Sequence, residues 1–224
     1  MDPAIEEAIK LETGDSPPYT QDLLSSVGYL EVVHARDIEA LRDCPNVEVL
    51  SLIGCDPVDL RVLSGLERLS SLVVQVSNLR SIAGVAHLPS LYKIELTASL
   101  VEDLAELQSC RGLRYVKLQG NPLAESSYRE VISSLRAEGV RVAFPDEREW
   151  RINGLLREAG FLYGYYRAHD GYRLCRPGLR LTDHPEMNHP IVDPGRLEEI
   201  IATNPAALPE LFRRMDLMPR TLGP

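Results

Sequence analysis

The sequence predicts an α/β solenoid, with a parallel sheet on its concave side and 3₁₀ or short helices on its convex side. Two observations predict this fold. Pairs of apolar residues recur every 22 residues, at Leu50 and Leu52, Leu72 and Val74, Ile94 and Leu96, and Val116 and Leu118. The second half of each unit carries an apolar residue at every third position, which suits a 3₁₀ or short helical turn better than a strand. A period of this length is typical of solenoids.

Each unit also begins with an apolar residue and ends its strand with a small or polar side chain. The leading residues are Val47, Leu69, Leu91 and Leu113. Three positions after the last apolar strand residue come Cys55, Ser77, Ser99 and Asn121. A polar side chain at this point is placed to bond the backbone of a turn. The apolar residues of the second halves are Leu60, Leu63 and Leu66, then Ile82, Val85 and Leu88, then Leu104, Leu107 and Cys110.

Residues 27–144 resemble the leucine-rich repeat family, in its 22-residue class, through the frame L-x-x-L-x-L and the residue that follows it. The last unit carries the turn Gly120-Asn121-Pro122-Leu123, followed by Tyr128, and looks like the closing cap of spliceosomal and phosphatase-regulating repeat proteins. The resemblance implies a leucine-rich repeat solenoid whose end is covered by a capping helix. It also implies a rigid concave surface that faces a protein partner.

A degenerate first unit is expected upstream, because Leu30 lies 22 residues before Leu52 and further apolar residues keep the same step. We expect its strand to be poorly formed, since Ser25 and Gly28 occupy the first two apolar positions. A terminal repeat that breaks the pattern acts as a cap. Residues 1–24 are expected to form an N-terminal helical cover, and residues 25–144 the solenoid.

Residues 145–224 are predicted to form a small α+β extension that packs on or next to the solenoid. We expect a helix over residues 146–160 and a β-hairpin in which aromatic residues flank Asp170-Gly171. Residues 177–194 are rich in proline and should be irregular. Two further helices are expected, one beginning at Asp193-Pro194-Gly195 and one over residues 207–215.

The composition favours a folded protein that works without nucleic acid or membrane. Apolar residues make up 44% of the 224, no run of about 18 of them could span a membrane, and the amino terminus lacks the features of a secretion signal. We therefore expect a cytoplasmic protein whose four cysteines are buried thiols. The net charge of −9 and the scarcity of lysine argue against binding to phosphate backbones. No cofactor is predicted.

The predicted binding surface is the concave side of the sheet, because alternate strand residues point to opposite faces. The residues between the core positions form three columns, Val49, Ser71, Lys93 and Tyr115, then Ser51, Val73, Glu95 and Lys117, then Ile53, Gln75, Thr97 and Gln119. This surface is half apolar at its amino-terminal end and polar with charges at its carboxy-terminal end, which suits a protein partner. The alternative is that Glu95 only pairs with Lys93 or Lys117 on a solvated sheet.

The extension holds the remaining candidates. Tyr163, Tyr165 and Tyr166 are secondary candidates for binding a partner, and the alternative is that they pack on the neighbouring helix or cap. His184 and His189 lie among acidic residues and are the candidates for a metal site. Their spacing of five, with a proline between them, fits no helical pair of ligands, so we predict neither a metal nor a catalytic residue.

These features favour a non-enzymatic module for protein-protein interaction, for example a bacterial adaptor or immunity-type protein, as a monomer or weak homodimer. Two alternatives stay open. One is an enzyme or enzyme subunit whose site uses the histidines and aspartates of the extension, and metal analysis would distinguish it. The other is a self-associating structural subunit, in which the extension of one chain caps the solenoid of another. The mass in solution would distinguish that one.

Overall fold

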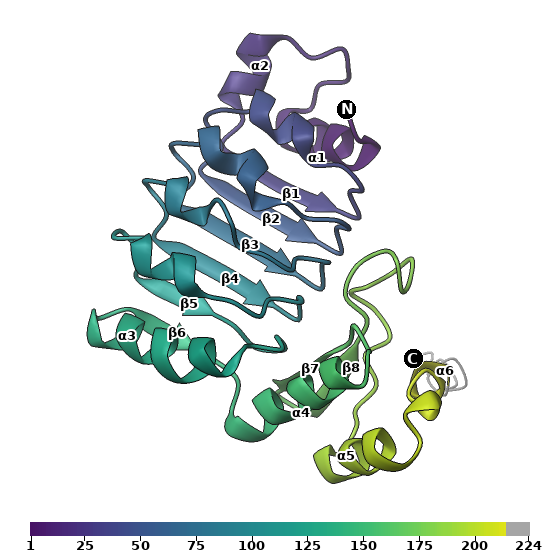
Figure 1. Ribbon diagram of the computed structural model, residues 1–224. Helices are drawn as coiled ribbons and strands as arrows, with labels where there is room; N and C mark the ends of the chain where they lie inside the picture. Colours follow the sequence, from purple (N-terminus) through teal and green to yellow (C-terminus); the bar gives the residue numbers. More distant parts are fainter. Residues whose placement is uncertain (214–224) are drawn as a thin grey trace.

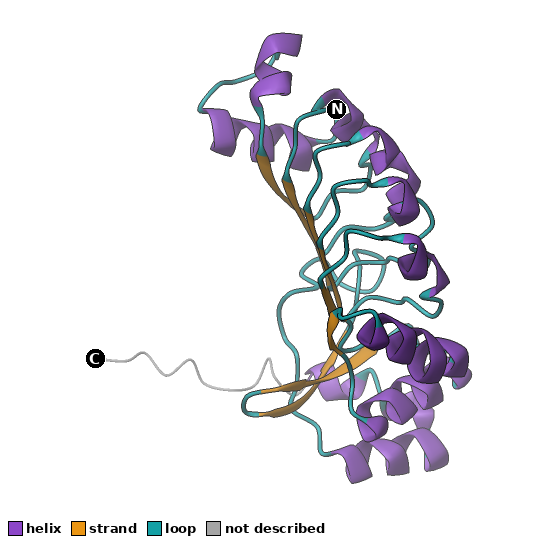
Figure 2. Cartoon of the chain, turned by 90° about the vertical axis from the view of Figure 1, so that its left-hand side faces the viewer, coloured by secondary structure: helices purple, strands orange, loops and turns teal. Residues whose placement is uncertain are grey.

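A computed structural model describes residues 1–213 of the chain (Figure 1). Its main sheet has six parallel strands in sequence order. They are β1 Tyr29–Val33, β2 Val49–Ile53, β3 Ser71–Gln75, β4 Lys93–Thr97, β5 Tyr115–Lys117 and β6 Arg141–Ala143. The 3₁₀ helices of the other layer are η1 Glu39–Asp43, η2 Leu60–Gly65, η3 Val85–His87 and η4 Ala105–Ser109. The side view shows the two layers of a curved body (Figure 2). The α/β solenoid is confirmed.

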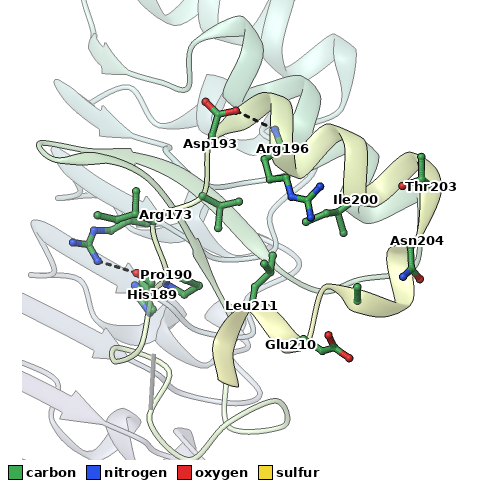
Figure 3. A pocket seen from close by; sticks show the side chains of 13 residues that line it. Arg173, His189, Pro190, Asp193, Arg196, Ile200, Thr203, Asn204, Glu210 and Leu211 are labelled. Atoms are coloured by element: carbon green, nitrogen blue, oxygen red, sulfur yellow. Dashed lines mark hydrogen bonds between the residues drawn. The ribbon is translucent and has the colours of Figure 1, made fainter. Parts of the chain in front are cut away.

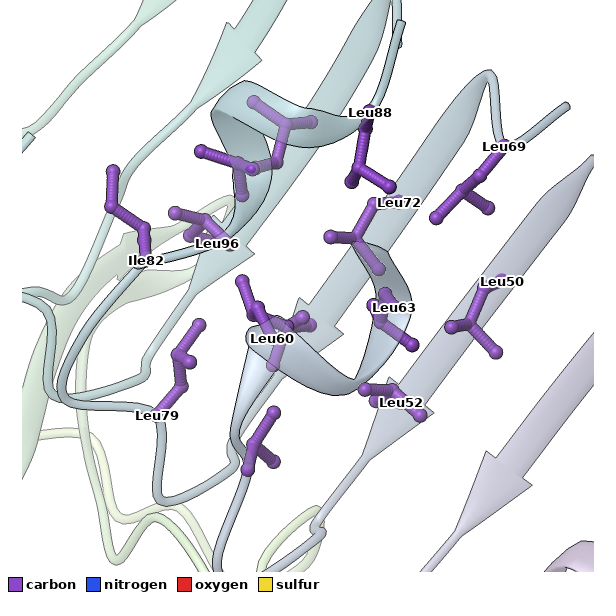
Figure 4. Close-up of a cluster of buried hydrophobic side chains, with 14 of the residues drawn as sticks. Leu50, Leu52, Leu60, Leu63, Leu69, Leu72, Leu79, Ile82, Leu88 and Leu96 are labelled. Carbon is purple, nitrogen blue, oxygen red and sulfur yellow. The ribbon is translucent and has the colours of Figure 1, made fainter. Parts of the chain in front are cut away.

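The strands pair in the register that the 22-residue period predicts. Leu50 pairs with Leu72, and Leu72 pairs with Ile94. Between the sheet and the 3₁₀ helices, the repeated leucines stack in a core from which water is excluded (Figure 4). Each such side chain contributes about 1.5–3 kcal/mol when it is fully buried. The stack is therefore the main source of the stability of the solenoid.

The first unit differs from the prediction. β1 is a complete strand, and Leu30 pairs with Leu50 rather than with Leu52. The step from this unit to the next is two residues shorter than the later steps, because the turn after β1 is shorter. Its frame is filled by the buried residues Val27, Leu30 and Val32. Placing Ser25 and Gly28 in the apolar positions was therefore wrong.

The turn after each strand is defined by a left-handed backbone conformation. One equivalent residue in five successive units has a positive φ, and we call this row the left-handed column: His34, Gly54, Val76, Ala98 and Gly120. The N–H groups of the first four members donate to carbonyls of the next unit, as Gly54 does to Gln75 at 3.0 Å. The Gly120 N–H donates to the Glu149 carboxylate instead. The turn-bonding role predicted for the next position is confirmed at Ser77, which accepts from the Cys55 N–H at 3.0 Å.

Both ends of the solenoid core are covered. At the amino-terminal end lie α1 Pro3–Thr13 and α2 Gln21–Ser26, and Ile5 and Ile9 of α1 are fully buried in the core. At the other end a π-helical turn, Ser127–Val131, continues into α3 Ile132–Ala137. β6 then pairs with β5 and adds a strand that the sequence analysis did not predict. The specific likeness of this end to spliceosomal and phosphatase-regulating caps stays a prediction.

The extension begins with α4 and a hairpin. Its elements are α4 Glu147–Glu158, β7 Gly164–Ala168, β8 Gly171–Cys175, α5 Pro194–Thr203, a 3₁₀ turn at Pro205–Ala207 and α6 Glu210–Arg213. The hairpin and the first two predicted helices are confirmed. Asp146 and Asp193 cap α4 and α5 by accepting from backbone N–H groups, which is why these helices begin where they do. The last predicted helix is broken into two short pieces, and its residues 214–215 lie outside the described residues.

From the hairpin the chain runs back along the carboxyl ends of the strands, toward the first unit (Figure 1). The Gly178 N–H donates to the Val76 carbonyl at 2.8 Å, and the Arg180 N–H donates to the Asp56 carboxylate at 2.7 Å. Further on, Glu186 reaches the His34 imidazole. The extension is therefore docked on the solenoid of its own chain. Over residues 1–213, no helix has the length and apolarity needed to cross a membrane.

Candidate functional site

The predicted binding residues lie on the concave side of β2 to β5, and we call this surface the concave face. The three columns are aligned by the sheet register, for example Val49 beside Ser71 and Ser71 beside Lys93. Most of these side chains are half-buried. Ser51 and Ser71 are buried, with only 9% and 5% of their surface exposed. These two serines therefore offer little surface to a partner.

The concave face also includes β1, which the sequence analysis missed. Tyr29 and Val33 are 44% and 38% exposed, and Glu31 between them is also exposed. β1 pairs with β2, so these side chains extend the three columns by one unit. The signal was present in the frame formed by Val27, Leu30 and Val32. It was hidden because this unit departs from the 22-residue step.

The charged end of the concave face is internally paired. Lys93 Nζ lies 2.9 Å from Glu95 Oε1, and Lys117 Nζ lies 3.6 Å from Glu95 Oε2. The hydrogen bond that Lys93 donates to Glu95 raises the pKa of Lys93. The Arg141 guanidinium lies over the Tyr115 ring, 5.9 Å from its centroid. Because one carboxylate serves two ammonium groups and an arginine adjoins them, this end is net positive on an acidic chain.

The extension borders one side of the concave face. Ile53 of the third column and Tyr166 of the hairpin both pack against the cluster of Val76, Ala98 and Cys175. The hairpin reaches past the sheet on the side away from the convex helices (Figure 2). The concave face is thus bounded at the carboxyl ends of its strands by residues of the same chain.

The three tyrosines of the hairpin are mainly packing residues. Tyr163, which comes just before β7, and Tyr165 of β7 are both buried in the core of the extension. The Tyr165 hydroxyl donates to the Val192 carbonyl at 2.8 Å, and its ring stacks on Tyr172. Tyr163 and Tyr165 are buried and so offer little surface to a partner, and the role of the three tyrosines as partner contacts stays a prediction. Tyr166 is half-buried between the hairpin and the solenoid.

The two candidate histidines do not share one site. His189 Nδ1 lies 2.8 Å from the Tyr166 hydroxyl, and its Nε2 lies 2.6 Å from the Pro185 carbonyl. Burial lowers the pKa of His189. His189 therefore holds its loop in place. His184 instead lies in a group with Glu186 and His34. Nothing in the sequence pointed to His34, since the contact spans most of the chain.

A cavity of about 590 Å³ lies between the hairpin, α5 and α6 (Figure 3). Its wall mixes apolar side chains with charged ones. Three of the charged groups have structural roles: Arg173 pairs with Asp170, Arg196 pairs with Glu199, and Asp193 caps α5. The cavity wall is therefore partly apolar, and these three charged groups are already paired or capping within the extension.

The repeat register, the layer of 3₁₀ helices and the concave parallel sheet together define the leucine-rich repeat fold. The chain resembles the solved structure of an internalin from Listeria monocytogenes, with a TM-score of 0.50 and 18% identity over 66% of this chain. The chain spans about half the length of that internalin, 52%. This likeness supports the fold alone.

Two other solved structures are more distant. Internalin C2 of the same species has a TM-score of 0.46 and 16% identity, over 68% of this chain and 80% of the other. A leucine-rich repeat protein of Leptospira interrogans has a TM-score of 0.46 and 16% identity, over 58% and 35%. No protein-family model matches the chain. No curated protein matches it either.

Proposed function

We propose that this chain is a non-enzymatic module that binds another protein on its concave face. The observation that carries the proposal is the composition of the concave face. Exposed Tyr29 and Val33 lie at one end, Tyr115 and a net positive cluster lie at the other, and β2 and β3 connect the two ends. Aromatic and aliphatic anchors beside oriented charges are the usual elements of a specific protein interface.

The sheet is already ordered before any partner arrives. Its strands are hydrogen-bonded from β1 to β6, and the core beneath them is closed by helices at both ends. A preformed surface binds without the entropic cost of ordering loops. The concave face therefore has the rigidity that such a function requires.

The charges indicate how the partner is oriented. An acidic segment of the partner fits over Lys93, Lys117 and Arg141, and an apolar segment fits over Tyr29 and Val33. Rim charges of this kind act mainly on orientation and association rate. A bacterial adaptor or immunity-type protein that covers another protein is the version we favour. The four free thiols fit a reducing compartment such as the cytoplasm.

Affinity capture from the native host, followed by mass spectrometry, tests the proposal. The wild-type chain is compared with a variant that carries Val73→Glu and Lys93→Glu on the concave face. A control variant carries Ala86→Glu and Arg111→Glu, which are exposed on the far side and change the net charge equally. We expect one protein to be recovered with the wild type and the control and lost with the concave variant.

Circular dichroism of all three proteins checks that each is folded before capture. A partner that is kept by the concave variant and lost by the control would refute the assignment of the concave face. The alternative that the chain is an enzyme makes a different prediction. An enzyme would convert a substrate, whereas the proposed module would stay bound to a protein partner.

A further inference from the structure

We propose that His34, His184 and Glu186 form a binding site for a divalent transition-metal ion of the zinc class. One ligand atom of each side chain lies within 4.8 Å of the others. His34 Nε2 lies 2.7 Å from Glu186 Oε2, and His184 Nδ1 lies 3.7 Å from Glu186 Oε1. The two imidazole rings are tilted by 58° to one another, with their centroids 5.7 Å apart. The site is separate from the concave face and does not depend on the function proposed above.

The donor set fits zinc. Two imidazole nitrogens and one carboxylate oxygen are common zinc ligands, at metal-ligand distances of about 2.0–2.2 Å. In a tetrahedral site with such distances, neighbouring ligand atoms lie about 3.3 Å apart. The distances of 2.7 and 3.7 Å run to the two different oxygens of Glu186, and one ligand atom of each side chain lies within 4.8 Å of the others, so all three ligands are already close to this spacing. A small rotation of the side chains therefore creates three of the four positions, and water can take the fourth because His184 is 64% exposed.

The turn after β1 holds His34 in place. His34 belongs to the left-handed column, with a φ of 65°. Its ring lies against Gly54, where a Cβ would come 2.7 Å from the His34 Cδ2 atom and 3.3 Å from Pro185. Because Gly54 has no side chain, both the His34 imidazole and Pro185 of the extension can pack against its backbone.

The loop that carries the other two ligands is also ordered by local contacts. The Met187 N–H donates to the His184 carbonyl at 3.1 Å and closes a turn that contains Glu186. The His189 ring binds the Pro185 carbonyl from the other side. His184 and Glu186 are therefore presented together toward His34. A bound ion would join this loop of the extension to the first unit, two segments that are far apart in the sequence.

Zinc titration of the full chain tests this site. Protein freed of metal with a chelator is titrated with Zn²⁺ in a calorimeter and with Co²⁺ by visible absorption, which reports nitrogen and oxygen ligands directly. We expect one ion per chain. Loss of a side chain that only orients a ligand already lowers metal affinity about 10–100-fold. We therefore expect His184→Ala and Glu186→Gln each to lower the affinity by at least about 10-fold.

The matched control is His169→Ala, since His169 lies on the hairpin turn, away from the three ligands, and is 93% exposed. This variant should bind zinc like the wild type. Zinc should also raise the unfolding temperature of the wild type and of His169→Ala, but not of His184→Ala, because an ion that binds only the folded state stabilises it. Failure of the wild type to bind zinc would overturn the proposal. So would stoichiometric binding that survives both ligand substitutions.

Discussion

Replacing Glu149 by glutamine tests how the extension is attached to the solenoid. Glu149 is almost fully buried, and its carboxylate accepts from the Gly120 N–H at 2.8 Å and from the Arg167 N–H at 3.1 Å. It thereby joins the last turn of the solenoid, α4 and the first strand of the hairpin. Burial raises the pKa of Glu149 from 4.5 to about 7, although the two N–H donors act in the opposite direction.

This raised pKa fixes the sign of the pH dependence. Between pH 4.5 and about 7 the folded state keeps a proton on Glu149 that the unfolded state has lost, so the free energy of unfolding falls as the pH rises. Each pH unit of such a difference corresponds to about 1.4 kcal/mol. The rise of the pKa from 4.5 to about 7 therefore corresponds to a loss of about 3 kcal/mol across this window.

Urea unfolding of the wild type and the Glu149→Gln variant, at several pH values from 4.5 to 7.5, measures the effect. The difference in free energy of unfolding between the two proteins isolates Glu149, since glutamine does not titrate. Neighbouring Asp146 has a lowered pKa and stays ionised throughout. We expect the wild type to lose about 3 kcal/mol relative to the variant as the pH rises. A difference that stays constant, or that grows in favour of the wild type, would refute the reasoning.

Two further predictions concern backbone conformation and thiol reactivity. In urea unfolding, Gly120→Ala should lower the free energy of unfolding more than Gly14→Ala does. Both glycines have a left-handed backbone, which costs alanine about 1–2 kcal/mol. Only at Gly120 would the new Cβ also clash, because it would lie 2.9 Å from the Ala98 Cα. Equal losses would contradict this. Cys175 should resist iodoacetamide at pH 8 until urea unfolds the chain, because burial raises the pKa of its thiol to about 12. Mass spectrometry would show early labelling if this is wrong.

The solenoid was predictable because its contacts are local and periodic. A residue such as Leu72 pairs with residues one unit away on either side, so one register determines all the strands. The same regularity explains the error in the first unit. A turn two residues shorter than the others leaves the apolar frame at Val27, Leu30 and Val32 intact but moves it out of step with the rest.

The candidate sites were predictable only in part. Alternation along a strand shows which side chains point to the concave side, but it does not reveal that Ser51 and Ser71 are buried there, since that depends on the sizes and positions of neighbouring side chains. The contact between His34 and Glu186 joins the two ends of the fold through the docked extension. A contact between residues so far apart in the sequence leaves no periodic pattern from which it could be predicted.

The path of the extension along the left-handed column has a consequence for how this protein can evolve. Solenoids usually gain or lose whole repeats freely, because each repeat contacts only its neighbours. Here a single short segment touches three successive units, through Gly178 at Val76, Arg180 at Asp56 and Glu186 at His34. Inserting or deleting a unit among these three would leave the segment with the wrong length. The length of the extension therefore fixes the number of repeats beneath it, and that number can change only if the length of the extension changes too.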